Sequence, residues 1–211
     1  MLIEIFSDIV CPWCYIGKRR LDAVLAEPDA AGVEVVWRPY QLYPGLPADG
    51  MPRDEFMRAR FGDGARAGDV YRRILGEAEG AGLDLHFDRI ERAPNTLRAH
   101  RLMSWAEPSG RQHALAEALF SAYFREGRDV GDPAELAALA TQVGLDRAGA
   151  AAMLATDDET DKVRAELDLG RSAGIEGVPC FVLAGRFAIP GAQPVDVMRQ
   201  LIARARERLV G

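Results

Sequence analysis

The 211-residue sequence has the composition of an ordinary globular protein, with 48% hydrophobic and 27% charged residues. Its formal net charge of −6 and its short, interrupted basic clusters argue against nucleic acid as the main partner. No run approaches the ~18–20 apolar residues of a membrane-spanning helix, and no signal-peptide pattern is present, so we expect a cytoplasmic protein without a membrane partner. Three cysteines are too few for a disulfide framework.

The first elements predict a β-α-β unit. Residues 2–7 are short and rich in β-formers, which predicts a mostly buried strand. Apolar residues recur at helical spacing over residues 15–25, and residues 33–37 predict a second strand. The crossover between the strands has about the length that parallel pairing needs.

The middle of the chain is predominantly helical. A loop with four prolines and two glycines covers residues 39–52. A break at residues 62–64 separates the first two helices, and alternation over residues 83–87 predicts a short extended piece. Asp132 and Asp146 are predicted N-caps, the former in a capping box. The predicted helices cover residues 54–61, 69–81, 95–105, 112–125, 133–144, a short stretch after 146, and 158–173.

The C-terminal part returns to mixed structure. A turn-rich link over residues 174–179 leads to a hairpin of residues 180–183 and 187–189, and a helix follows to about residue 209. The element order predicts an α/β protein with a thioredoxin-like fold and an inserted all-helical subdomain. We expect residues 1–45 and 158–211 to form the discontinuous thioredoxin-like domain, and residues 46–157 to form the insertion.

The cysteine pair Cys11 and Cys14 lies where the first strand turns into the first helix. A helix N-terminus carries unpaired N–H groups and partial positive charge, which stabilises a thiolate. Pro12 suits the first helical position, and Trp13 between the cysteines tunes their environment. Cys11 should therefore be the accessible nucleophile, and Cys14, turned inward, should resolve the mixed disulfide.

Two other uses of the pair remain open at this point. A zinc site would need four protein ligands, and only Cys180, His86, His100 and His113 could complete one with the cysteine pair. The sequence contains no second pair of residues at the spacing typical of metal ligands. We therefore expect no metal. A purely structural pair of packed thiols is the other alternative.

The segment from Phe6 to Gly17 resembles the active-site segment of DsbA-type thioredoxin-fold oxidoreductases, specifically the FrnE-like subgroup. Asn95-Thr96 followed by Ala99-His100-Arg101-Leu102 resembles the helical insertion of that group. Gly177-Val178-Pro179 and Gly191-Ala192-Gln193-Pro194 resemble its C-terminal half. The resemblance covers essentially the whole chain, with the motifs in the right order.

The resemblance implies dithiol–disulfide exchange with protein or small-molecule disulfides, without a required cofactor. Glutathione would be a possible co-substrate, and glutathione or a thioredoxin would recycle the pair. It also implies a cis-proline at Pro179 that exposes the backbone of Val178 beside Cys11 for an extended peptide. The sequence leaves a monomer and a homodimer equally open.

Two residues depart from the family pattern or stand out within it. Cys180 follows the predicted cis-proline, where the family more often has another residue type; it is either a buried small hydrophobe or a third redox-active or metal-binding thiol. Glu4 is a carboxylate inside an apolar strand. It lies either at the wet end of the strand or beneath the disulfide as a proton relay to Cys14.

Two residues of the predicted insertion complete the candidate site. Asn95 is the predicted N-cap of its helix and belongs to the family motif. His100 borders the apolar arc of the same helix, so a packing role is favoured over a catalytic one.

Two other functions remain as alternatives. Kappa-class glutathione transferases and 2-hydroxychromene-2-carboxylate isomerases share the architecture, but they typically have serine at the position of Cys11 and lack the second cysteine. The presence of both cysteines favours the oxidoreductase. The other alternative is a non-enzymatic binding module that uses the pair as a redox sensor.

Overall fold

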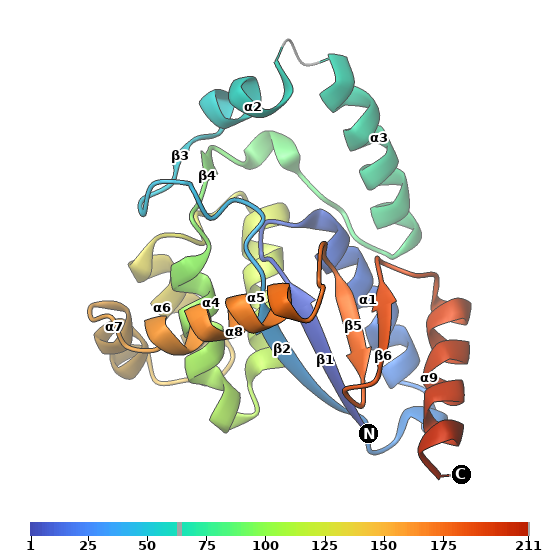
Figure 1. Ribbon diagram of the computed structural model, residues 1–211. Coiled ribbons are helices and arrows are strands. Elements are labelled where there is room, and N and C mark those ends of the chain that lie inside the picture. Colours follow the sequence, from blue (N-terminus) through green and yellow to red (C-terminus); the bar gives the residue numbers. More distant parts are fainter. Residues whose placement is uncertain (63–64, 211) are drawn as a thin grey trace.

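A four-stranded sheet of order β2-β1-β5-β6 forms the centre of the computed structural model, which describes residues 1–62 and 65–210 (Figure 1). Strand β1 (Leu2–Ser7) pairs in parallel with β2 (Glu34–Pro39) and antiparallel with β5 (Cys180–Leu183). Strand β6 (Phe187–Pro190) closes the hairpin with β5. The first strand therefore lies beside a strand from the far end of the sequence.

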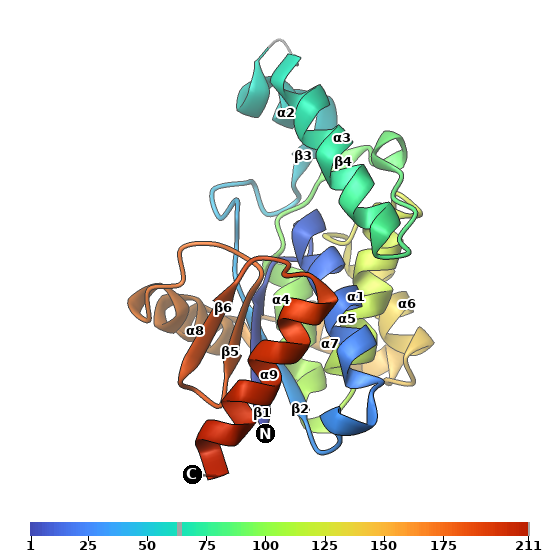
Figure 2. The ribbon, with the colours of Figure 1, turned by 90° about the vertical axis from the view of Figure 1, so that its right-hand side faces the viewer.

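Helices cover both faces of this sheet (Figure 2). Helices α1 (Pro12–Leu25) and α9 (Val195–Val210) contact each other on one face, and α8 (Thr160–Ser172) covers the other. Successive side chains of a strand point to opposite faces. Ile3 and Ile5 accordingly join the main core, whereas the ring of Phe6 lies against Gly170 of α8. This arrangement is the thioredoxin-like α/β fold that the element order predicts.

The remaining helices come from the middle of the chain. Helices α2 and α3 lie beyond the end of the sheet where α1 begins, and α4 to α7 pack beside β2 and α8 (Figure 1). Two-residue strands β3 (Met51–Pro52) and β4 (Arg92–Ala93) pair within this part, which the prediction of an all-helical insertion did not include. The helices are α2 (Arg53–Phe61), α3 (Ala65–Gly80), α4 (Leu97–Ala106), α5 (Gln112–Phe124), α6 (Pro133–Gln142) and α7 (Arg147–Leu154).

Short 3₁₀ turns connect several of these elements, at Pro28–Ala30, Phe87–Arg89 and Glu107–Ser109. The predicted N-caps Asp132 and Asp146 are confirmed, because the carboxylate of Asp132 accepts a hydrogen bond from the amide of Glu135 and that of Asp146 accepts from the amide of Gly149. Part of the predicted break, residues 63 and 64, lies outside the described residues. The division into domains after residues 45 and 157 stays a prediction.

The extended piece predicted over residues 83–87 forms no strand, and its last residue, Phe87, begins a 3₁₀ turn. Leu83 and Leu85 are buried, so the alternation of apolar residues reflects real burial. This segment nevertheless pairs with no strand in the described structure, and the amide of His86 donates instead to the carbonyl of Phe124 at the end of α5. Alternation predicts which side chains are buried, whereas a strand also needs a neighbouring strand.

Side chains of α5 hold α1 in place. The ring of Tyr15 stacks on Phe120 with centroids 5.1 Å apart. The ammonium of Lys18, only 3% exposed, lies 2.8 Å from a carboxylate oxygen of Asp22 and 2.9 Å from one of Glu117. The buried charge is therefore paired, as burial of an ammonium requires.

Candidate active site

Cys11 is the N-cap residue of α1, directly after the loop that follows β1. Its backbone is extended (φ −92°, ψ 111°), and Pro12 occupies the first helical turn. The amide of Cys14 donates to the carbonyl of Cys11 at 3.0 Å, which closes the first turn. The pair thus spans one helical turn with its first sulfur at the positive end of the helix.

Cys14 is the more deeply placed thiol of the pair, with 2% of its surface exposed. Burial, together with the thiol of Cys11 beside it, raises the pKa of Cys14 well above its usual value. Hydrogen bonds with the Ser7 side chain and the backbone of Asp8 lower the pKa of Cys14, but they do not outweigh this increase. Cys14 is therefore held as a neutral thiol, in keeping with the inward position predicted for it.

The loop before β5 meets Cys11 from the far end of the chain. The peptide bond between Val178 and Pro179 is cis, the isomer that the family resemblance implies. The carbonyl oxygen of Val178 lies 3.7 Å from the Cys11 sulfur. A Cβ on Gly17 of α1 would approach a side-chain carbon of Pro179 to 3.0 Å, so this glycine lets helix and loop meet closely.

Cys180 lies on the opposite face of the sheet from α1. It forms a small apolar cluster with Phe6 and Ile175, and burial raises the pKa of its thiol. The next residue, Phe181, belongs to the main core instead. Because neighbouring strand residues point to opposite faces, the geometry supports the packing role of Cys180 over a third redox-active thiol.

Glu4 also lies on the α8 face. Its carboxylate is 2.9 Å from the Nε of Arg38, and the Nη1 of the same guanidinium lies 3.1 Å from the carboxylate of Glu166 on α8. The sheet therefore lies between Glu4 and the cysteine pair. This position favours a surface ion-pair role for Glu4, and it does not bring Glu4 beneath Cys14.

Asp8 is a fully buried carboxylate close to the cysteine pair in sequence. The sequence analysis did not predict it as a site residue. One of its oxygens accepts from the amide of Leu42 at 2.7 Å, and the other lies 3.4 Å from Nε2 of His100. The same nitrogen of His100 lies 2.9 Å from the carbonyl oxygen of Tyr40. His100 and Asp8 thus fix the loop that follows β2. The sequence feature that could have singled out Asp8 is the position of a carboxylate three residues before Cys11.

Asn95 lies one residue before the N-cap of α4, which is Thr96 rather than the predicted Asn95. Its Oδ1 accepts from the amide of Leu97 at 3.0 Å and from the side chain of Gln41 at 3.1 Å. Its Nδ2 donates to the carbonyl of Leu46 at 2.8 Å. Asn95 therefore ties the 41–46 loop to the start of α4.

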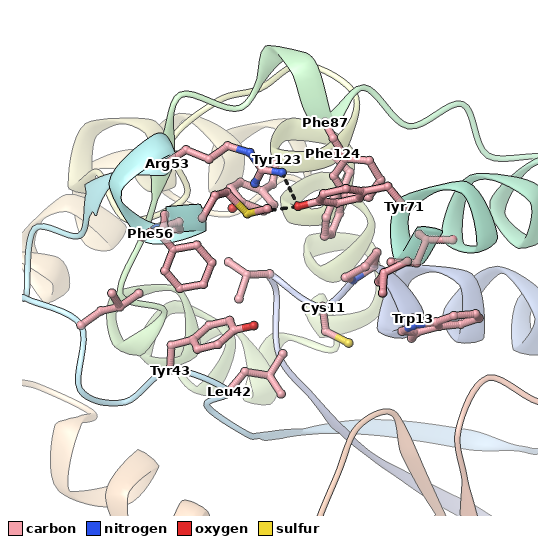
Figure 3. A pocket seen from close by; sticks show the side chains of 18 of the residues that line it. Cys11, Trp13, Leu42, Tyr43, Arg53, Phe56, Tyr71, Phe87, Tyr123 and Phe124 are labelled. Carbon is pink, nitrogen blue, oxygen red and sulfur yellow. Dashed lines mark hydrogen bonds between the residues drawn. The ribbon is translucent and has the colours of Figure 1, made fainter. Parts of the chain in front are cut away.

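A cavity of about 300 Å³ opens beside Cys11, between the start of α1 and the α2–α3 part of the chain (Figure 3). Trp13 lies at its edge, with the guanidinium of Arg73 5.5 Å from its ring. The lining is largely aromatic and aliphatic, and within residues 1–62 and 65–210, as far as their side chains are described, Arg53 is its only charged side chain. Apart from the residues around the cysteines, the lining residues are Leu42, Tyr43, Leu46, Arg53, Phe56, Met57, Val70, Tyr71, Ile74, Phe87, Ala93, Pro94, Tyr123 and Phe124.

Among residues 1–62 and 65–210, no group of three or more His, Cys, Asp or Glu side chains could hold a metal ion. Within the same residues, no helix has the length and apolarity that crossing a membrane demands. All three cysteines are free thiols. The reactive groups that the site offers are therefore its thiols.

Comparison with known proteins agrees with this geometry. The chain is 30% identical to the Bacillus subtilis (strain 168) protein YwbO, over 98% of both chains. The probable DsbA oxidoreductase SCO1869 from Streptomyces coelicolor is 36% identical in sequence, and its crystal structure superposes with a TM-score of 0.88 over 98% of this chain and 90% of that chain.

More distant structures share the fold. A 2-hydroxychromene-2-carboxylate isomerase (16% identity, TM-score 0.75) matches over 100% of this chain and 98% of that chain. The cytosolic disulfide reductase DsbM from Pseudomonas aeruginosa, solved with GSH (18% identity, TM-score 0.71), matches over 98% of this chain and 100% of that chain. The profile of the DSBA-like thioredoxin domain matches residues 2–203. The chain therefore belongs to the DSBA-like thioredoxin domain family, whose members include disulfide oxidoreductases and isomerases.

Proposed function

We propose that the protein catalyses dithiol–disulfide exchange, with Cys11 as the nucleophile and Cys14 as the resolving thiol. The observation that carries this proposal is the asymmetry of the pair. Cys11 lines the cavity at the helix N-terminus, whereas Cys14 is buried on the inner side with a raised pKa. Both thiols are buried, with 4% and 2% of their surfaces exposed, but only Cys11 belongs to the described cavity lining. A nucleophile that faces the substrate cavity, followed by a protected resolver, is the arrangement that two-step exchange needs.

The reaction proceeds in two balanced steps. The Cys11 thiolate attacks one sulfur of a substrate disulfide, forming a mixed disulfide and releasing the other sulfur as a thiolate. Cys14, after losing its proton, attacks the Cys11 sulfur and releases the second substrate thiolate. The substrate is reduced and the pair is oxidised, so a thiol reductant must restore the dithiol before the next turnover.

The surroundings of the pair have supporting roles in this proposal. Pro12 and Trp13 shape the first turn, and the cis bond before Pro179 presents the carbonyl of Val178 to the nucleophile. The exchange requires no dissociable cofactor. Glutathione is a candidate reductant, since the DsbM structure of the same fold was solved with GSH. The cytosolic DsbM, which shares the fold, supports action in a reducing compartment such as the cytoplasm.

Insulin reduction with separate single-cysteine variants tests the proposal. We expect Cys11→Ser to abolish catalysis, and Cys14→Ser to accumulate a mixed disulfide that mass spectrometry detects. Cys180→Ser is the matched control, because Cys180 lies on the other face, and it should retain the parent rate. Parent-like insulin reduction by Cys11→Ser would overturn the proposal. The equilibrium of the pair with glutathione buffers would give the direction of the reaction, since reductants lie near −270 mV and strong oxidants near −120 mV.

The same variants separate the two alternatives. A glutathione-dependent isomerase or transferase would bind glutathione tightly and retain its activity in Cys14→Ala. A redox-sensing binding module would show no turnover with any disulfide and would form a stable complex with a partner protein.

A further inference from the structure

The side chains that line the cavity beside Cys11 determine which disulfides can bind there. Aromatic and aliphatic side chains from α2, α3, α5 and the 41–46 loop surround it, and Cys11 lies at its base (Figure 3). Its volume of about 300 Å³ is roughly twice that of a ~150 Å³ protein cavity that holds benzene. The space therefore suits a compact body of one or two rings.

The aromatic walls are arranged edge to face and tilted, as apolar ligand sites commonly are. Tyr43 and Phe56 meet with ring centroids 4.8 Å apart, and Tyr71 and Phe87 with centroids 4.6 Å apart. In Figure 3 the rings of Tyr43 and Phe56 lie to the left of Cys11, and those of Tyr71 and Phe87 lie above it. A ring entering between them would contact aromatic faces and edges on both sides.

Arg53 is the one charged side chain among the described residues that line the cavity. Its guanidinium donates to the hydroxyl of Tyr71 at 2.8 Å and lies 5.8 and 5.9 Å from the ring centroids of Tyr71 and Phe87. Among the described residues, none of the ion pairs involves Arg53 and no carboxylate lines the cavity. A half-buried guanidinium held by aromatic rings is a ready partner for a carboxylate or a similar anion.

We propose that the disulfide which enters this cavity is a small molecule, that the half which enters has an apolar, aromatic body and one anionic group, and that Arg53 binds this anion. The inference rests on the proposed exchange function and names its substrate class. Glutathione disulfide fits the walls less well, because its body is polar and its ammonium groups would find no carboxylate among the lining residues that the structure describes.

The chemistry is that of the proposed exchange. Cys11 attacks one sulfur of the aryl disulfide, and an aryl thiolate leaves with the electron pair of the broken S–S bond. Cys14 then releases the second aryl thiol and closes the Cys11–Cys14 disulfide. A low-molecular-weight thiol reductant restores the dithiol and is itself oxidised.

The test compares a charged and a neutral disulfide of the same shape. The reduced protein is mixed in single turnover with 4,4′-dithiodibenzoate, with the neutral 4,4′-dithiobisbenzamide, with glutathione disulfide and with insulin. We expect Arg53→Gln to slow the reaction with the dibenzoate roughly ten- to hundredfold, the value of a charge-assisted hydrogen bond, and to slow the reaction with the neutral bisbenzamide by no more than about twofold. Arg53→Lys, which keeps the charge, should restore part of the lost rate.

The matched control is Arg58→Gln, since Arg58 is on the same helix but is 70% exposed and paired with Asp54. It should react with every disulfide like the parent. Equal slowing of charged and neutral disulfides by Arg53→Gln, no slowing at all, or faster reaction of the parent with glutathione disulfide than with both aryl disulfides would each overturn the inference.

A binding measurement separates this inference from the exchange chemistry. The thioether 4-(phenylthio)benzoate cannot exchange, and its binding should quench the fluorescence of Trp13 in the parent and weaken roughly tenfold or more in Arg53→Gln. Binding without exchange of any disulfide would refute the proposed function alone. Exchange of insulin and glutathione disulfide without thioether binding would refute only the substrate class.

Discussion

The sulfur of Cys11 lies 3.7 Å from the carbonyl oxygen of Val178, although 167 positions separate the two residues in the chain. The antiparallel pairing of β1 with β5 creates this contact, because it sets the loop before β5 against the start of α1. Half of the site therefore depends on a long-range strand pairing. A change that displaces the loop should impair exchange without touching either cysteine.

Gly17→Ala tests that dependence. The added Cβ would lie 3.0 Å from a ring carbon of Pro179 and 3.1 Å from the ring of Phe181, so the loop or helix must shift. We expect a loss of roughly 1–3 kcal/mol in the free energy of unfolding by urea, and slower insulin reduction. Gly76→Ala is the matched control in α3, where the added Cβ meets nothing within 4 Å. It should stabilise the protein by about 0.5–1 kcal/mol, since alanine favours helix. Equal effects of the two changes would contradict the close contact.

The pKa of Cys14 predicts selective alkylation. Burial and the neighbouring Cys11 thiol raise the pKa of Cys14, so its thiol stays protonated at pH values where an ordinary cysteine, with a pKa near 8.5, would ionise. Iodoacetamide at pH 7 should label Cys11 well before Cys14 or Cys180, and labelling of Cys14 should require more alkaline conditions. Tandem mass spectrometry of the peptides reads the order directly, and earlier labelling of Cys14 would contradict it.

Asn95→Ala should release the 41–46 loop from α4. The change removes three hydrogen bonds, to Gln41, Leu46 and Leu97. Each typically contributes about 0.5–1.5 kcal/mol, so we expect a loss of roughly 1.5–4.5 kcal/mol in the free energy of unfolding. Amide hydrogen exchange over residues 41–46 should accelerate. Asn95→Asp keeps the accepting oxygen and should have a smaller effect; an unchanged exchange rate in the alanine variant would show that the loop is held otherwise.

Acid should weaken the contact between α1 and α5 through Asp22. Burial disfavours the charge of Asp22, but hydrogen bonds from His113 and Lys18 outweigh it and hold the pKa of Asp22 below its usual range. A carboxyl whose pKa is lower in the folded state stabilises the fold above about pH 4 and loses that contribution as pH falls through the folded pKa. The free energy of unfolding should therefore decrease on acidification below about pH 4.

Asp22→Asn should lower stability near neutral pH and flatten this acid dependence. Glu34→Gln is the control, since Glu34 is exposed at the start of β2. It should leave the stability profile close to that of the parent. An acid transition of unchanged steepness in Asp22→Asn would assign the pH dependence to other carboxyls.

Local sequence patterns were sufficient to predict the positions of Cys11 and Cys14. A strand of β-formers, a proline suited to the first helical turn and apolar residues at helical spacing place Cys11 at the helix start and Cys14 on its inner side. These are short-range effects, so the sequence by itself determined the asymmetry of the pair. Residues 83–87 show the limit, because their alternation was correct but a strand needs a partner that local sequence does not name.

Only the tertiary structure decided which residues meet the pair. Glu4 lies on β1, the strand that leads to the cysteine pair, and Cys180 lies on β5, directly after Pro179. The alternation of side-chain direction along these strands nevertheless turns both side chains toward α8. Arg53 carries no sequence signal, and it reaches the cavity because α2 and α3 pack over the end of the sheet. Which face a side chain takes depends on pairing and packing between distant segments, and periodicity within one segment cannot specify it.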